Sequence, residues 1–247
     1  MAMTKYTLEA HEICTSTMEL AKSWVEQSKS HSESPHVIWA LEQTQGRGKL
    51  DREWISSKGN LFFTTVIPFY MDRRRVGELS FLVAVALGGA ISSLNSALNI
   101  SYKWPNDILI SEKKVGGVLL ETLSKEESLF VSIGVGLNIA SFPPGLISTS
   151  LEAQGIIISP KEMLEKILKE FSYFLDVWYA EGFEPIRLRW SRKAWNKGAE
   201  LRVKTFSKEI VGVFESIDHL GRLILIQEDG RRSQLFSGDV LLTRRND

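Results

Sequence analysis

The chain has 247 residues with a formal net charge of zero, 43% hydrophobic and 24% charged residues. The length predicts one main domain and a small second one. The proportion of hydrophobic and charged residues excludes a disordered chain, and a net charge of zero gives no overall positive potential that would attract nucleic acid. Its single cysteine, Cys14, excludes an internal disulfide. No signal-peptide pattern appears, and the apolar run 81–91 is too short to cross a membrane. We therefore expect a cytoplasmic protein with no membrane partner.

Residue periodicity predicts alternating strands and helices through most of the chain. Strands are expected over 6–10, 37–41, 60–68, 108–110, 115–123 and 129–139, and helices over 17–25, 78–98 and 160–180. Ser16 or Thr17 is suited to cap the first helix. The polar turn 111–114 predicts a hairpin between the two strands that flank it. The pattern favours an α+β fold with a mixed β-sheet flanked by helices.

The pattern changes after Trp195. Short strands are expected over 201–206, 209–217, 223–227 and 233–236, with glycine-containing turns between them. This is typical of a small β-barrel, too small to hold the main core. We therefore expect a catalytic or binding domain over residues 1–196 and a small β-barrel domain over residues 197–247.

The segment 103–107, Lys-Trp-Pro-Asn-Asp, is the most informative part of the chain. Proline fixes its own φ and restricts the residue before it, so Lys103 is expected to be a charge held in a defined place. From composition alone, a solvated lysine before a turn is the more common case, and it is the full Lys-Trp-Pro-Asn-Asp string that favours a placed charge at Lys103. A second basic segment, 46–54, threads Arg47, Lys49 and Arg52 through two glycines. Together the two segments predict a site for an anionic ligand.

Two glycine-containing segments invite comparison with nucleotide-binding motifs. Segment 46–54 lacks the Gly-x-x-x-x-Gly-Lys-Ser/Thr pattern of a Walker A loop, and on its own it could be a solvated charged loop. Segment 134–138, Gly-Val-Gly-Leu-Asn, lacks the third glycine and the following helix of a dinucleotide-binding fold. Its glycines allow close approach of a ligand, but they could also serve strand packing, as could Gly116 and Gly117. The four scattered histidines and single cysteine provide no metal-binding set.

The order and spacing of segments 46–54, 103–107, 113–121 and 134–138 resemble those of the biotin protein ligases, which join biotin to a lysine of carboxylase carrier domains. Ser16-Thr17 and segment 236–240 extend the resemblance over most of the chain. It implies that the enzyme activates biotin with ATP and Mg²⁺ to biotinyl-5'-AMP and transfers it to a biotin carboxyl carrier protein of the acetyl-CoA carboxylase type. It also implies an SH3-like C-terminal barrel and a homodimer. No helix-turn-helix module is expected ahead of the catalytic domain, so DNA is not an expected partner.

The resemblance assigns roles to individual residues. The catalytic residues would be Lys103, Arg47 and Asp107. The biotin-binding residues would be Ser16, Thr17, Met18, Gln43, Gly46, Arg47, Gly48, Lys49, Lys103 and Gly117. The nucleotide-binding residues would be Lys49, Arg52, Trp54, Asn106 and Asn138. The chain departs from the usual pattern at Met18, Lys49 and Asp51, where asparagine, arginine and glycine are common, and Asp51 is expected to affect retention of the adenylate.

The residues support this chemistry independently. An acyl-adenylate forms when a carboxylate attacks the α-phosphate of ATP, and fixed cations stabilise the charge that spreads over the phosphoryl oxygens. Lys103 suits that task as a compact point charge, whereas Asp107 could hold the acceptor lysine or simply cap a turn. Two alternatives remain: a lipoate or octanoate attachment enzyme, and a non-catalytic biotin sensor. The first is disfavoured because the chain lacks an Arg-Arg-x-x-Gly-Gly-Gly segment.

Overall fold

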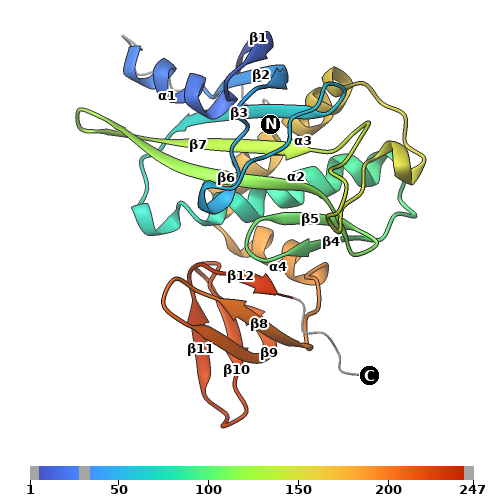
Figure 1. Ribbon diagram of the computed structural model, residues 1–247. Coiled ribbons are helices and arrows are strands. Elements are labelled where there is room, and N and C mark those ends of the chain that lie inside the picture. Colours follow the sequence, from blue (N-terminus) through green and yellow to red (C-terminus); the bar gives the residue numbers. More distant parts are fainter. Residues whose placement is uncertain (1–5, 28–33, 242–247) are drawn as a thin grey trace.

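The computed structural model describes residues 6–27 and 34–241. Seven strands form the central sheet (Figure 1): β1 (Thr7–Cys14), β2 (His36–Gln43), β3 (Leu61–Pro68), β4 (Ile100–Lys103), β5 (Asp107–Ile110), β6 (Lys113–Lys125) and β7 (Ser128–Leu137). Their spatial order is β1-β2-β3-β7-β6-β5-β4. Strands β1 and β2 run parallel and the other neighbours run antiparallel. The sheet is therefore mixed, as the sequence predicts.

Helices cover the two faces of this sheet unequally. Helices α2 (Glu78–Leu94) and α3 (Pro160–Glu181) cover one face, and α1 (Thr17–Gln27) packs on part of the other. Successive strand residues point to opposite faces, and Val37 packs in the main core while its neighbour Ile38 packs with Val25 of α1. The face that carries α1 is thus only partly covered, which leaves room there for a site.

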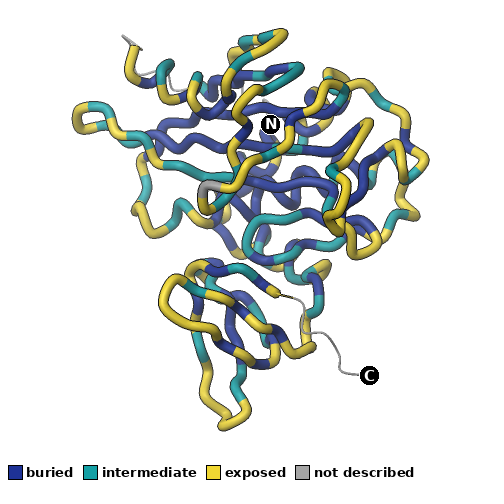
Figure 2. Tube along the Cα trace, viewed as in Figure 1, coloured by how far each residue is buried: buried dark blue, intermediate teal, exposed yellow. Residues whose placement is uncertain are grey.

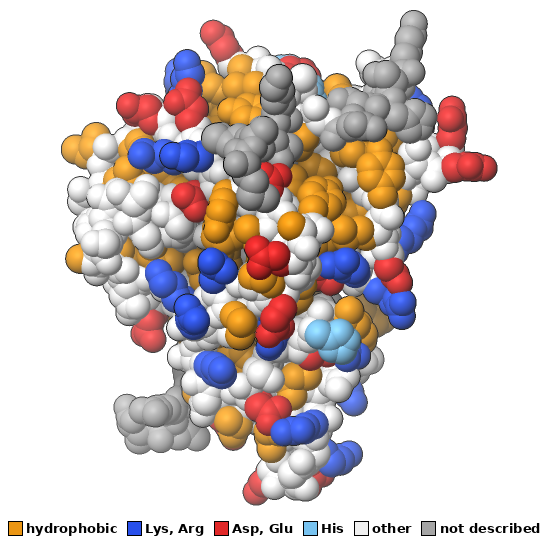
Figure 3. All heavy atoms as spheres, turned by 180° about the vertical axis from the view of Figure 1, so that it is seen from behind, with side chains coloured by type: hydrophobic (Ala, Val, Ile, Leu, Met, Phe, Trp, Pro, Cys, Tyr) orange, Lys and Arg blue, Asp and Glu red, His pale blue; other side chains and the backbone are white. Residues whose placement is uncertain are grey.

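Helix α2 lies at the centre of the buried layer (Figure 2), so the apolar run 81–91 is a core helix, as expected. The predicted helix 78–98 is wrong at its end, because Asn95 has extended backbone (φ −152°) and its side chain accepts from the amide of Ala97. The chain then enters β4, a strand that the sequence prediction missed. On the helix-covered face, acidic and basic side chains are interspersed (Figure 3).

The sequence prediction also missed helix α4 (Glu184–Arg192). A second sheet, antiparallel, follows this helix. Its strands are β8 (Glu200–Lys204), β9 (Glu209–Ile217), β10 (Leu223–Ile226), β11 (Arg232–Leu235) and β12 (Asp239–Leu241), in the order β11-β10-β9-β8-β12. Over the described residues these pairings form an open sheet rather than a closed barrel. The C-terminal sheet packs against the part of the protein that contains the first sheet. At this contact the Trp104 indole donates to the carbonyl of Gly221, in the turn between β9 and β10 (3.0 Å).

Glu78 is a buried charge at the start of α2, with 2% of its side chain exposed. Arg75 donates to it (2.9 Å to Oε2), and the Trp178 indole on α3 donates to the same oxygen (2.6 Å). The Arg75 guanidinium also lies 5.1 Å from the centroid of the Trp178 ring. This cluster ties α2 to α3 behind the sheet.

We predict that Glu78→Ala lowers the free energy of unfolding by about 2–4 kcal/mol, because it leaves a guanidinium and a buried indole N–H without an acceptor. Glu184→Ala is the matched control: Glu184 also pairs with an arginine three residues away, Arg187, but 56% of its side chain is exposed. The control should cost less than about 1 kcal/mol. Urea denaturation measures both, and equal losses would contradict this account of the cluster.

Candidate active site

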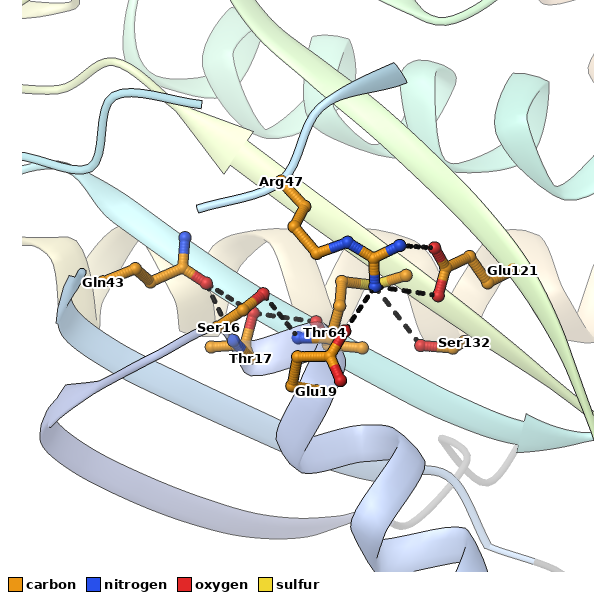
Figure 4. A network of polar contacts seen from close by, with 9 residues as sticks. Ser16, Thr17, Glu19, Gln43, Arg47, Thr64, Glu121 and Ser132 are labelled. Carbon is orange, nitrogen blue, oxygen red and sulfur yellow. Dashed lines mark hydrogen bonds and ion pairs between the residues drawn. The ribbon is translucent and has the colours of Figure 1, made fainter. Parts of the chain in front are cut away.

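A hydrogen-bonded cluster lies where α1 begins, between the ends of β2 and β3 (Figure 4). Oε1 of Gln43 accepts from the Thr17 amide (2.8 Å) and the Thr17 hydroxyl (3.1 Å), and the Thr64 hydroxyl donates to that of Thr17 (2.8 Å). Gln43 Nε2 donates to Ser56 (2.9 Å). The Ser16 hydroxyl accepts from the Met18 amide (3.3 Å) and so caps α1, as predicted. Donors and acceptors of both kinds are therefore fixed here.

Glycines on β6 and β7 form a flat floor beside that cluster. A Cβ on Gly136 would overlap the Trp54 indole, and one on Gly134 would lie 2.7 Å from the Met18 sulfur. Gly117 also faces Trp54, with ordinary contact at 3.4 Å. The absence of side chains at these positions lets a flat ring system lie directly on the backbone, and Trp54 takes that place in this structure.

The segment 46–54 is a compact loop. The Trp54 amide donates to the Gly46 carbonyl (2.9 Å), and the Gly48 amide donates to the Arg52 carbonyl (2.6 Å). At the tip, Leu50 has left-handed backbone (φ 55°) and a largely exposed side chain. The side chain of Asp51 lies outside the described part of the chain. The loop is thus folded on itself, and its contacts with the rest of the protein come from its side chains.

Each basic side chain of this loop has an acidic or carbonyl partner. Arg47 lies between Glu19 (2.6 Å) and Glu121 (2.5 Å), which join it to α1 and β6 (Figure 4). Arg52 pairs with Asp239 on β12 (3.0 Å). Lys49 donates to the Gly238 carbonyl (2.7 Å) and lies 3.8 Å from Asp239; burial lowers its pKa. The C-terminal sheet therefore meets the predicted phosphate-binding loop.

Lys103 and Asp107 lie opposite each other in the β4–β5 hairpin. Asp107 pairs with Lys114 (2.6 Å), whose ammonium lies 5.2 Å from the centroid of the Trp54 ring. Among the described residues, the side chain of Lys103 has no ion pair or hydrogen bond. Burial lowers the pKa of Lys103, and neighbouring Asp107 partly opposes that shift. Lys103 is thus a desolvated cation whose hydrogen-bond donors remain available.

The two predicted nucleotide-binding asparagines make contacts within the protein. Asn106 donates to the Val118 carbonyl (2.7 Å), and the buried Asn138 donates to the Thr149 carbonyl (3.0 Å). Those donors hold loops in place, and each side-chain oxygen remains as a possible ligand contact. Their nucleotide-binding roles stay predictions.

Two hollows flank the loop. One, of about 440 Å³, is lined by loop residues that include Arg47 and Arg52. The other, of about 330 Å³, lies between the two sheets and is lined by Lys49, Asn106 and Phe236 among others. Among the described residues, no group of three or more histidine, cysteine, aspartate or glutamate side chains could hold a metal ion.

Sequence reasoning missed the carboxylates that pair with the loop. Glu19 and Glu121 looked like ordinary surface residues of a helix and a strand, and nothing in the local sequence indicates that they meet Arg47. Asp239 lies in segment 236–240, which contributes to the family resemblance, so the sequence marked this residue as significant. The sequence did not indicate that Arg52 is its partner. Lys114 and Trp195 were also missed as neighbours of the site.

Comparisons with known proteins agree with this geometry. Residues 11–138 match the Biotin/lipoate A/B protein ligase family. The biotin--[acetyl-CoA-carboxylase] ligase of Paracoccus denitrificans is 33% identical over 205 residues, which cover 79% of this chain and 85% of that protein. This chain belongs to that family. The bifunctional ligase/repressor BirA of Bacillus subtilis is 31% identical over 241 residues, or 94% of this chain and 73% of that protein.

Solved structures extend the likeness to nearly the whole fold. The biotin protein ligase from Aquifex aeolicus, in complex with biotin and ATP, is 27% identical with a TM-score of 0.79. The match covers 95% of this chain and 97% of that chain. Both sheets therefore lie within the part of the chain that follows the ligase fold.

We predict that Gly136→Ala increases tryptic cleavage within segment 46–54 about tenfold, because the methyl group displaces Trp54 and about 1.4 kcal/mol of loop anchoring is lost. Gly117→Ala, whose Cβ makes only ordinary contact with Trp54, is the matched control and should leave the cleavage rate within about twofold of wild type. Mass spectrometry of the fragments locates the cut. Equal rates for the two variants would show that Trp54 does not anchor the loop on the glycine floor.

Proposed function

We propose that this protein is an ATP-dependent, AMP-forming ligase that converts biotin to biotinyl-5'-AMP and transfers biotin to a lysine of a biotin carboxyl carrier protein of the acetyl-CoA carboxylase type. One observation carries the proposal most directly: an unpaired, desolvated Lys103 lies near a basic loop and a glycine floor in a member of this ligase family. The similar proteins are named for biotin, so the lipoate and octanoate alternatives are not favoured.

The two half-reactions need positive charge at one point. A biotin carboxylate oxygen attacks the α-phosphorus of ATP, and the bond to the leaving pyrophosphate breaks. The acceptor lysine amine then attacks the acyl carbon, loses a proton, and expels AMP. Lys103 would contact first the carboxylate and then the α-phosphate, while Lys49 and Arg52 would leave Asp239 for phosphate oxygens. The carboxylate of Asp107 would orient the incoming amine.

The cluster around Gln43 supports the predicted biotin end of the site. A ureido group carries one carbonyl acceptor and two N–H donors, and the hydroxyls of Ser16 and Thr17 with the amide of Gln43 offer matching groups. Met18 and Gly117 would border the rings, with Gly46, Arg47 and Gly48 closing over them. Trp54 would have to move off the floor to pack against the adenine.

Mg²⁺ belongs to the proposal as a companion of ATP. The described residues form no cluster of metal-binding side chains, and the nearby carboxylates of Asp107 and Asp239 are each paired with a cation. This fits an ion that keeps several waters and is held chiefly by the triphosphate, neutralising its charge. Such an ion would enter and leave with the nucleotide.

The remaining parts of the proposal concern organisation. We assign residues 1–196 to a catalytic domain and 197–247 to an SH3-like domain, with the boundary between α4 and β8. The cytosol is the expected location. The exposed edge of β1 offers backbone groups for pairing with a second copy in a homodimer.

The proposal is tested by incubating the protein with biotin, ATP, Mg²⁺ and a purified biotin carboxyl carrier domain, and measuring the carrier's mass. A carrier in which the acceptor lysine is replaced by arginine is the matched control. Biotin should appear only on the lysine form. An adenylate that forms without any transfer to carrier domains would contradict the second half-reaction, and binding of biotin without an adenylate would favour a sensor.

We predict that Lys103→Ala slows adenylate formation by about 10²–10³-fold, the range seen when one fixed group that stabilises transition-state charge is removed. Lys113→Ala is the control, since Lys113 is an exposed lysine on the same sheet. Single-turnover release of pyrophosphate gives both rates. A wild-type rate in Lys103→Ala would remove Lys103 from the reaction.

We predict that Arg47→Ala speeds dissociation of biotinyl-5'-AMP by about tenfold or more, because a charge-assisted hydrogen bond contributes about 1.5–3 kcal/mol. Arg231→Ala, which removes an exposed arginine in a turn of the C-terminal sheet, should have no effect. Chase experiments with unlabelled adenylate measure the rate. Unchanged adenylate retention together with unchanged biotin affinity would refute the role of Arg47.

A further inference from the structure

One aromatic side chain beside Lys103 has no part in the roles above. The Lys103 Nζ lies 5.3 Å from the centroid of the Trp195 ring, and only 8% of Trp195 is exposed. We propose that Trp195 is a positioning residue that holds the Lys103 ammonium at the reacting carboxylate and phosphate without neutralising its charge. The inference rests on the proposed function and names a further residue of that same site.

The backbone fixes Trp195 in this place. After α4 the chain runs alongside the outer edge of β4: the Tyr102 amide donates to the Lys193 carbonyl and the Trp195 amide donates to the Tyr102 carbonyl, each at 2.8 Å. Ala194 forms a parallel bridge with Tyr102. The bridge at Ala194 thus brings Trp195 next to Lys103, and the contact between the ammonium and the ring shows that the two side chains lie on the same side of the β4 edge.

An aromatic ring suits a lysine that must meet an anion. Its negative face attracts an ammonium but accepts no strong hydrogen bond, so the three N–H donors stay free. Lys114 shows the contrast, because the carboxylate of Asp107 already binds it at 2.6 Å. A carboxylate at the position of Trp195 would hold Lys103 more tightly and also compete with the substrate.

The wider surroundings of Lys103 carry both signs of charge. Asp107 on β5 and Asp239 on β12 favour its protonated form, and Lys114 on β6 and Arg52 on the loop oppose it. Burial has the largest effect on the pKa of Lys103 and lowers it. The ring of Trp195 attracts the cation and so opposes the effect of burial on the half-buried Lys103.

A double-mutant cycle tests the proposal. The affinity of a non-hydrolysable analogue of biotinyl-5'-AMP is measured by calorimetry for wild type, Trp195→Leu, Lys103→Ala and the double variant. We expect Trp195→Leu to weaken binding about fivefold when Lys103 is present and less than about twofold in the Lys103→Ala background. In turnover, Trp195→Leu should lower kcat for adenylate formation by a larger factor than it raises the KM for biotin, because Lys103 meets the carboxylate in the bound substrate and the phosphate as charge develops.

Trp195→Phe is the conservative control. The Trp195 indole N–H has no hydrogen-bond partner among the described residues, so phenylalanine keeps a ring face and loses no hydrogen bond. It should restore the analogue affinity to within about twofold of wild type. If Trp195→Leu does not fold, Trp195→Met, which fills more of the indole's volume, replaces it in the cycle and the same outcomes apply.

Different failures have different meanings. Equal effects of the Trp195 substitution with and without Lys103, or no effect at all, would overturn the positioning role while the ligase function stands. A wild-type protein that neither binds the analogue nor makes an adenylate would overturn the proposed function itself.

Discussion

Repulsion among basic side chains is the constraint on which the architecture of this site depends. Arg47, Lys49, Arg52, Lys103 and Lys114 gather around one part of the sheet, and partial burial of Lys49 and Lys103 makes their charge costly. Carboxylates from four separate elements pair with these cations: Glu19 from α1, Glu121 from β6, Asp107 from β5 and Asp239 from β12. Without a ligand, the protein's own anions thus neutralise most of the cluster. In the proposed function, an incoming phosphate chain would replace the protein's own carboxylates as the partners of Lys49 and Arg52.

The same basic side chains help to join the two sheets. The contacts of Lys49 and Arg52 with Gly238 and Asp239 link the loop to the C-terminal sheet, and the bond from Trp104 to Gly221 links that sheet to the segment that carries Lys103. Both contacts involve residues proposed to bind the nucleotide or their close neighbours: Lys49 and Arg52 themselves, and Trp104, which lies two residues before Asn106. The C-terminal sheet is therefore part of the environment of the site, and its docking helps set the position of the loop. Lys103 differs from the other cations because its hydrogen-bond donors remain free: Lys114 also lies against an indole, but Asp107 pairs with it.

The sequence predicted the strands and helices whose periodicity is strong, and the motifs whose residues are adjacent in the chain. The hairpin at 111–114 is confirmed by left-handed backbone at Ser111 and Glu112, and the amphipathic pattern of 160–180 by α3 with its Ser159–Glu162 capping box. Strand β4 was missed because it has only four residues and begins two residues after the predicted end of the helix at Leu98, and β12 because it is only three residues long. The partners of Arg47 and Lys103 could not be predicted, since they come from residues 28, 74 and 92 positions away that only the folded sheet brings together.

The central claim is that this site activates biotin as an adenylate, and pyrophosphate exchange into ATP tests it most directly. The measurement compares biotin, lipoate, octanoate and no added acid, each with Mg²⁺. The account predicts exchange that depends on biotin. Exchange that depends instead on lipoate or octanoate, or no exchange from a protein that still binds biotin, would contradict it.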